Sequence, residues 1–394
     1  MSKKILVATI AIFCTLLPTD SAAQYFYIPV HRTNLLFAGD IMQHQNQLDA
    51  ARTTEGTYSY SGYYRHIQGV VKSADIAVAN LETPIGRSNF SGYPSFCAPD
   101  SFLYAARDAG FNVLLFANNH CLDRGARGVR RTLAMLDSLG IEHTGVYLDS
   151  IDRAQRHPYI LKKNNMRIAL LNYTYGTNGR NVPAPMVVNL IDREVIAEDI
   201  QKAKSMNVDA IIACMHWGDE YVSLPPERVR DLADWLVEQG VSHIIGNHPH
   251  VIQPIEIKED PTTPDRHAVV YSTGNLVSNM SLTNTDGGIV VRMELKKTFN
   301  YTRLSSLDYL FTWIAPRQNN GKRDFTILPA ATTVITGSSR AAQMRTVSSR
   351  LYRTLARRGW LASSLARTQG AFSSIYLLAR EMTLNTSARA FWKA

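Results

Sequence analysis

The sequence predicts an α/β protein, in which short apolar strands alternate along the chain with amphipathic helices. Apolar runs of strand length recur, and segments with helix start and stop signals separate them. With 394 residues, of which 45% are hydrophobic and 19% charged, the chain can bury one large core, or a core with an appendage. No internal repeat is visible, so the alternation indicates an α/β domain with largely buried strands.

The first half of the chain supplies three of the expected strands and three of the expected helices. Pro99 followed by Asp100 is typical of a helix start, and Gly140 is typical of a helix end. The expected strands are 35–39, 74–79 and 111–117, and the expected helices are 62–73, 100–109 and 125–139.

The second half begins with a hairpin and continues with further strands and helices. Asn164 and Asn165 separate two apolar runs, which predicts a tight turn between paired strands. The last expected helix begins at prolines and ends at Gly240. The expected strands are 158–163, 167–173, 210–215, 251–258, 267–273 and 288–296, and the expected helices are 193–206 and 225–239.

Residues 1–23 have the pattern of a signal peptide. Lys3 and Lys4 precede an apolar run at 5–17, which is too short to span a bilayer, and the small residues at 21–23 offer a cleavage site. We therefore expect the mature chain to be exported, to the periplasm or the cell envelope. Nucleic acid is not an expected partner of an exported chain.

Three cysteines remain once the signal peptide is removed, and they are Cys97, Cys121 and Cys214. An odd number in an oxidising compartment permits at most one disulfide, and the sequence does not assign its partners.

The segment 340–394 carries the positive charge of the chain. It holds ten Arg and Lys residues and one acidic residue, Glu381, so it alone accounts for the net charge of +9. Apolar residues recur there at steps of three or four, which predicts an amphipathic helix with arginines on its other faces. That arginine face can be ordinary solvated surface, or it can hold an anionic polymer or an acidic membrane surface. The expected organisation is a signal peptide at 1–23, a main domain at 34–297, a linker or domain edge at 298–339, and a basic helical tail at 340–394.

The segment 242–253 concentrates the candidate chemistry. His248 and His250 flank Pro249, directly after a short apolar run that includes Ile244 and Ile245. A turn stiffened by proline can bring the two imidazoles together, and neutral imidazoles suit zinc, manganese or iron. An ordinary surface turn is the alternative.

Ligand-type residues also follow the other expected strands. They are Asp40, Asn80, Glu82, Asn118, Asn119, His120 and His216. In open α/β sheets the loops at the carboxyl ends of the strands line one crevice, so residues spread over two hundred positions can meet in one site. Taken singly, each has an ordinary explanation as a helix cap, a turn residue or a packed histidine.

Together these residues predict a site for one or two divalent cations, with manganese, zinc or iron as the candidates. The carboxylate of Glu82 can bridge two cations. Asp40 and His250 can complete one coordination sphere. The other sphere can be completed by Asn119, His216 and His248.

Six motifs occur along the chain in a fixed order. They are GDIM at 39–42, NLETP at 80–84, ANNH at 117–120 followed by Asp123 and Gly125, HWGDEY at 216–221, GNHPHVIQP at 246–254 and YSTGN at 271–275. In these motifs the chain resembles the bacterial capsule synthesis CapA family, which is associated with poly-gamma-glutamate capsules. That family is similar to the calcineurin-like metallophosphoesterases. The resemblance covers about 35–295, and it implies a metallophosphoesterase-like sandwich of β-sheets flanked by α-helices.

The chain departs from the wider metallophosphoesterase pattern at two positions. The first motif of that pattern is Asp-x-His, but here Met42 stands two residues after Asp40; the second supplies a bridging aspartate, where this chain has Glu82. A thioether is a poor ligand for a hard cation, so a mononuclear or reorganised centre stays open, with His44 as a substitute ligand.

The resemblance also implies roles for the remaining polar residues. His120 would protonate a leaving group or steady charge that develops on the substrate, and water activated by a cation would be the nucleophile. Glu220 joins His120 as a candidate catalytic group. The candidate substrate-contacting or ligand-supporting groups are Asn80, Asn118 and Asn275.

Two classes of function follow. In the first, the chain is a metal-dependent hydrolase that cuts a phosphoester or an amide bond, with an anionic polymer or a phosphoester as its substrate. In the second, it is an accessory protein that binds or exports an anionic capsular polymer together with envelope biosynthesis proteins, without turnover.

Overall fold

The computed structural model describes residues 29–259, 265–299, 301–315 and 323–329. The expected signal peptide and the expected basic tail lie outside these residues. Within the described part of the chain, no helix is long and apolar enough to cross a membrane.

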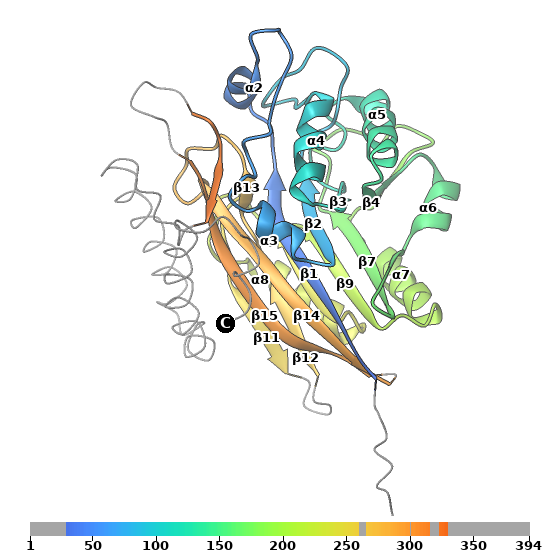
Figure 1. The fold of residues 1–394 in the computed structure, drawn as a ribbon. Helices are drawn as coiled ribbons and strands as arrows, with labels where there is room; N and C mark the ends of the chain where they lie inside the picture. Colours follow the sequence, from blue (N-terminus) through green and yellow to red (C-terminus); the bar gives the residue numbers. More distant parts are fainter. Residues whose placement is uncertain (1–28, 260–264, 300, 316–322, 330–394) are drawn as a thin grey trace, which may run out of the picture.

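The larger of two main sheets contains the first strand of the chain near its centre (Figure 1). Its strands, in spatial order, are β16 (Ile327–Pro329), β15 (Tyr301–Ile314), β14 (Gly287–Thr298), β1 (Val30–Ile41), β2 (Ile76–Leu81), β3 (Val113–Leu115) and β4 (Glu142–Thr144). A further strand, β13 (Asn275–Val277), pairs with the end of β1. Because β1 to β4 are parallel, their carboxyl ends lie at one edge of the sheet.

The second main sheet has a parallel centre and antiparallel edges. Its strands, in spatial order, are β11 (Ile255–Glu259), β12 (Arg266–Val270), β10 (His243–Asn247), β9 (Ala210–His216), β7 (Met166–Thr174) and β6 (Tyr159–Lys163). The four central strands run parallel. Two short strands, β5 (Val146–Tyr147) and β8 (Val187–Val188), form a separate ribbon.

Helices cover the outer faces of both main sheets. The helices are α2 (Gln45–Ala51), α3 (Gln68–Lys72), α4 (Asp100–Ala109), α5 (Gly125–Ser138), α6 (Ser150–Arg156), α7 (Arg193–Ser205) and α8 (Glu227–Glu238). Apolar side chains of α3, α4 and α5 pack on the larger sheet, and those of α7 and α8 pack on the smaller one. A third apolar cluster fills the space between the two sheets. The predicted sandwich of β-sheets flanked by α-helices is confirmed.

The strands are continuous apolar runs because both of their faces are buried. Along β1, Leu35 and Phe37 point into the cluster between the sheets, whereas Leu36 and Ala38 point toward the helices. The larger of these side chains, the two leucines and Phe37, each contribute about 1.5–3 kcal/mol when they leave water. This alternation fixes the register of β1, because a slip of one residue would exchange its two faces.

Several predicted boundaries differ from the structure; the strand expected at 111–117, for example, is β3 (Val113–Leu115). The helix expected at 62–73 is only α3 (Gln68–Lys72), because turns with bonds such as Tyr63 N–H to Tyr60 O precede it and direct both Tyr63 and Tyr64 into the core. The strand expected at 251–258 begins only at Ile255, because the preceding residues form the turn that follows β10. Of the segment expected to be a linker or domain edge, the described residues form all of β15 and β16, at the edge of the larger sheet.

Candidate metal centre

The carboxyl ends of strands from both sheets meet at one place. Asp40 lies at the end of β1 and Glu82 directly follows β2, both in the larger sheet. His216 ends β9, and His248 and His250 follow β10, in the smaller sheet. All five side chains are buried. The centre is therefore built across the two sheets.

Three overlapping sets of these side chains have the spacing of a metal site. The sets are Glu82, His216 and His248; Asp40, Glu82 and His250; and Glu220, His248 and His250. Within each set the candidate ligand atoms lie within 4.8 Å of one another. Glu82, His248 and His250 each belong to two sets, and of these only the Glu82 carboxylate has two oxygens with which it could bridge two cations. Glu220 is the exposed member.

Two buried atoms of the centre lack a hydrogen-bond partner. They are Oε1 of Glu82 and Nδ1 of His248. The nearest imidazole nitrogens to Glu82 Oε1 are Nε2 of His216 at 3.6 Å and Nε2 of His250 at 3.8 Å, and both are too far for a hydrogen bond. A buried unpaired polar atom costs about 1–3 kcal/mol, and a cation would pair both atoms. The donor set of carboxylates and imidazoles therefore fits manganese, zinc or iron.

The imidazoles of the centre are in the form that binds metals. Burial, followed by the neighbouring imidazoles, lowers the pKa of His248 to about 3 and the pKa of His216 well below its usual range. Both rings are then neutral at neutral pH, as ligation requires. Burial first, and then the neighbouring Asp40 carboxylate, raise the pKa of Glu82 well above its usual range. A bound cation would offset that repulsion.

The turn after β10 directs both of its histidines inward. His248 has a φ of 97° and His250 a φ of 57°, a left-handed backbone that is rare for residues other than glycine. Their ring centroids lie 5.9 Å apart. Gly246, at the base of this turn, has to be glycine, because a Cβ atom there would lie 2.0 Å from the carbonyl oxygen of Tyr271. The left-handed backbone of the two histidines is strained, and strain of this kind is typical of functional sites.

Three asparagines lie behind the candidate ligands. Asn80 Nδ2 donates to Asp40 Oδ1 at 2.8 Å and to Glu82 Oε2 at 3.3 Å. Asn118 Nδ2 donates to Leu81 O at 2.8 Å. Asn275 Oδ1 lies 3.0 Å from Nδ1 of His250, whose other neighbour is Asp40 Oδ2 at 3.1 Å. All three asparagines are buried; Asn80 and Asn275 contact the candidate ligands directly and can orient them, and Asn118 donates to Asn80 Oδ1 at 3.3 Å.

Asn119 and His120 occupy different positions although they are adjacent. Asn119 Oδ1 lies 2.9 Å from His216 Nε2, next to the ligand sets. His120 Nδ1 donates to Asp123 Oδ2 at 2.8 Å, and that oxygen also accepts the backbone N–H of Phe96 at 2.7 Å. His120 belongs to none of the three ligand sets. Its Nε2 faces Asn178 Nδ2, at 3.5 Å.

His44 and Met42 lie beside the centre. Met42 is buried, and His44 belongs to none of the three ligand sets. Nδ1 of His44 accepts the backbone N–H of Asn279 at 3.2 Å, so this nitrogen is already used. The three cysteines, Cys97, Cys121 and Cys214, are buried free thiols.

The loop that follows β7 also contributes side chains to the centre, and the sequence motifs do not predict them. Tyr175 lies parallel to the His216 ring, at an interplanar angle of 11°, and its ring centroid is 4.4 Å from that of His248. Asn178 accepts from Asn119 Nδ2 at 3.2 Å, and Arg180 Nε lies 3.7 Å from Asp123 Oδ1. These residues follow a strand end, as the predicted ligands do. That position is the sequence feature that could have marked them as part of the site.

Comparison with known proteins gives matches over most of the chain. Residues 34–280 match the family model described as "Bacterial capsule synthesis protein PGA_cap". The chain is 26% identical to the capsule biosynthesis protein CapA of Bacillus anthracis over 306 residues, which are 74% of this chain and 71% of the relative. It is 28% identical to the PGA biosynthesis protein CapA of Bacillus subtilis over 269 residues, 66% of this chain and 67% of the relative.

A solved structure also matches. The calcineurin-like phosphoesterase YfkN from Bacillus subtilis is 14% identical, with a TM-score of 0.41, and the match covers 83% of this chain and 99% of that one.

Proposed function

Because the chain belongs to the bacterial capsule synthesis protein PGA_cap family, we propose that it acts in the synthesis of a capsular polymer such as poly-gamma-glutamate, as a metal-dependent hydrolase of phosphoester or amide bonds. The observation that carries the proposal is the buried set of two carboxylates and three imidazoles, in which Glu82 Oε1 and His248 Nδ1 have no partner. Manganese, zinc and iron are the candidate metals.

The ligand residues divide between two positions. Asp40 and His250 would hold one cation, His216 and His248 would hold the other together with Asn119, and Glu82 could contribute to both. When bound, such cations supply Lewis-acid activation of water and of the bond to be cut. The asparagines behind the ligands keep the carboxylates and His250 oriented.

His120 is the proposed proton-transfer group. Asp123 accepts from Nδ1 and thereby fixes the orientation of the ring, which leaves Nε2 as the nitrogen that exchanges a proton with the substrate. In the protonated ring Nε2 carries the hydrogen that a leaving group would take. Asn178 contacts both Asn119 and Nε2 of His120, so it links this proton-transfer group to the ligands.

Metal analysis and an activity screen test this proposal together. We expect the purified chain to contain manganese, zinc or iron by mass spectrometry, and to hydrolyse an aryl phosphoester or poly-gamma-glutamate in a reaction that a chelator abolishes. Bound metal without turnover of any such substrate would favour the accessory role, in which the chain binds or exports the polymer. A chain that takes up no metal would contradict the metal centre itself.

We propose that the protein acts in the cell envelope. Export is supported by the pattern at 1–23, and cell fractionation with N-terminal sequencing tests it: a mature chain that begins at Gln24 in the envelope fraction is the expected result. An intact N-terminus in the cytoplasmic fraction would contradict export.

The basic segment 340–394 is proposed to hold an anionic partner, either the polymer or an acidic membrane surface. Each arginine or lysine near an acidic surface contributes about 1 kcal/mol, and salt screens the attraction. A chain without 340–394 should bind poly-gamma-glutamate and acidic vesicles more weakly than the full chain does at low salt. Neither chain should bind neutral vesicles. If the shorter chain is folded and binds the polymer and acidic vesicles as well as the full chain does, this segment has no role in binding an anionic partner.

A further inference from the structure

The loop between β7 and β8 contains a tight turn beside the metal centre. Asn178 and Gly179 have φ values of 51° and 72°, the positive sign that both central residues of a type I′ turn have and that an Asn-Gly sequence adopts readily. The backbone N–H of Arg180 donates to Thr177 O at 3.0 Å, and Thr177 Oγ1 donates to Arg180 O at 2.6 Å. Backbone atoms of Arg180 therefore fix its position, and its side chain is not needed to form the turn.

The side chain of Arg180 lies against the proposed proton-transfer pair. Its Nε is 3.7 Å from Asp123 Oδ1, and the other oxygen of Asp123 accepts from His120 Nδ1 at 2.8 Å. Asn178, two residues earlier, contacts both Nε2 of His120 and Asn119. One turn therefore brings a guanidinium to the place where the proton-transfer group and the candidate ligands meet.

The guanidinium of Arg180 has donors to offer a ligand. The Asp123 side chain is 1% exposed and that of Arg180 is 45% exposed, so the arginine covers the carboxylate and stays accessible itself. Among the described residues, none accepts a hydrogen bond from this guanidinium, because 3.7 Å is too long for one. A guanidinium carries five N–H donors, and two of them can bind the two oxygens of a carboxylate in parallel.

The charges around the centre indicate what Arg180 would bind. Four carboxylates belong to the ligand sets or contact the proton-transfer group, and they are Asp40, Glu82, Asp123 and Glu220. Among the described residues, Arg180 is the only arginine or lysine with a nitrogen within 4.0 Å of any of their oxygens. These carboxylates would repel a substrate anion unless a cation faces it. One guanidinium offsets one charge, which suits a carboxylate better than a phosphate group of charge about −1.5 to −2.

We infer that Arg180 binds a carboxylate of the substrate and thereby selects amides that carry a carboxylate near the bond to be cut. The inference rests on the proposed function and chooses between its two bond types. With its carboxylate against the guanidinium, such a molecule would have the neighbouring amide beside His120. A chain linked through γ-glutamyl bonds carries a carboxylate of this kind at every unit.

Binding of small probes to the purified full chain tests the inference without turnover. The probes are γ-glutamylglutamate, the same dipeptide with its carboxylates converted to carboxamides, and inorganic phosphate, each titrated by calorimetry in a chelator so that no cation contributes. The dipeptide should bind more tightly than the other two. Arg180→Ala should weaken its binding about tenfold, the effect of losing a charge-assisted hydrogen bond, and leave the carboxamide form unaffected. The segment 340–394 is present in both proteins, so the difference between them belongs to Arg180.

Kinetics on a matched pair of substrates separates binding from a structural role. The substrates are γ-glutamyl p-nitroanilide and its α-carboxamide analogue. Arg180→Ala should raise the KM of the first about tenfold and leave kcat and the KM of the second nearly unchanged, because the lost contact is made by the carboxylate alone. A role only through Asp123 would instead slow both substrates equally. Arg180→Lys should recover part of the loss in KM, since it keeps the charge but not the paired donors.

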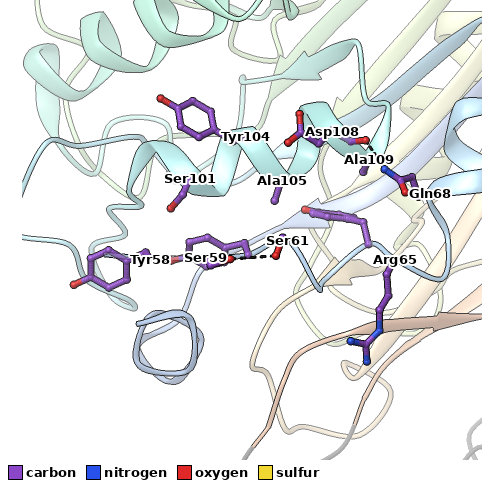
Figure 2. Close-up of a pocket in the computed structure, with 12 residues that line it drawn as sticks. Tyr58, Ser59, Ser61, Arg65, Gln68, Ser101, Tyr104, Ala105, Asp108 and Ala109 are labelled. Atoms are coloured by element: carbon purple, nitrogen blue, oxygen red, sulfur yellow. Dashed lines mark hydrogen bonds between the residues drawn. The ribbon is translucent and has the colours of Figure 1, made fainter. Parts of the chain in front are cut away.

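Arg65→Ala is the matched control. The side chain of Arg65 is 55% exposed and its Nη2 lies 3.7 Å from the Asp324 carboxylate, so the variant loses the same charge and an ion pair of the same length. Arg65 lines the groove of about 380 Å³ shown in Figure 2, which none of the candidate metal ligands lines. This variant should bind the probes and turn over the substrates as the wild type does.

Three results would each overturn the inference. They are equal binding of the dipeptide and its carboxamide form, an equal loss on both substrates in Arg180→Ala, and tighter binding of phosphate than of the dipeptide. If no amide is hydrolysed but Arg180→Ala still loses the preference for the dipeptide, the proposed hydrolase fails and the carboxylate site at Arg180 stands.

Discussion

Replacing Glu82 by glutamine is the sharpest test of the metal centre, because it should have opposite effects with and without metal. In the metal-free protein the Glu82 carboxylate is fully buried, lies close to the Asp40 carboxylate, and keeps Oε1 without a partner. Glutamine has nearly the same shape and no charge. It therefore removes the repulsion, and a small side-chain adjustment lets its amide donate to His250 Nε2, which lies 3.8 Å from Oε1.

The expected gain for the metal-free variant follows from the unpaired atom. An unsatisfied buried acceptor costs about 1–3 kcal/mol, so Glu82→Gln should raise the free energy of unfolding by about that amount. At this domain size 1 kcal/mol corresponds to about 2 °C, which gives a rise of about 2–6 °C in the melting temperature.

In the presence of metal, the wild type should have a higher melting temperature than Glu82→Gln, the reverse of the order expected without metal. A ligand present at a thousand times its Kd stabilises the folded state by about 4 kcal/mol, and the wild type should gain this in full. The variant lacks the carboxylate shared by two ligand sets, so it should bind far more weakly and gain little.

The assay is thermal melting in a chelator and then over a manganese or zinc titration. Glu220→Gln is the control: it changes an exposed carboxylate, and its metal-free melting temperature should match the wild type. If Glu82→Gln melts below the wild type in chelator, or gains as much from metal as the wild type does, the reasoning is refuted.

Three further outcomes are expected. Replacing His248 and His250 together by alanine should abolish metal uptake measured by mass spectrometry while the far-ultraviolet circular dichroism stays that of a folded chain; unchanged metal content would remove both from the centre. His120→Ala should keep the metal and lose about 100-fold or more in turnover, because it deletes a proton-transfer group outside the ligand sets; loss of metal instead would make His120 a ligand. Burial lowers the pKa of His243 to about 3, so between about pH 6.5 and 3 the unfolded chain binds a proton there that the folded chain does not, and folding stability falls as the pH drops. His243→Gln should therefore reduce that acid sensitivity by about 1.4 kcal/mol per pH unit in urea titrations at pH 6.5 and below; an unchanged slope would show that His243 is protonated in the folded protein.

The strands and most of the polar cluster could be predicted because their signals are local. An apolar run such as 210–215 is buried on both faces, and the residue after it, His216, can be read directly from the sequence. Parallel pairing then places such residues at one edge without any knowledge of the loops. Asp40, Glu82, His216, His248 and His250 lie together in the structure for this reason.

The loop after β7 could not be assigned in the same way. Tyr175, Asn178 and Arg180 are not typical metal ligands, and their contacts depend on how the loop crosses toward residues some 60 positions earlier in the chain. The helix expected at 62–73 failed for a related reason. Its apolar spacing suited a helix, but Tyr63 packs against Phe325, a partner more than 250 residues away, and such contacts override local preference.

The division of the ligands between the two sheets has a consequence for how long the protein lasts. Asp40 and Glu82 belong to one sheet and the three histidines to the other. A cation bound by both groups would therefore cross-link the two sheets at their polar edge. Without it, two buried carboxylates face each other there, and this edge is where the sheets should part first under thermal fluctuation. Local opening of this edge would expose backbone that proteases can cleave. If the centre binds a cation as proposed, scarcity of that cation would therefore lower the abundance of the folded protein as well as any activity of the centre.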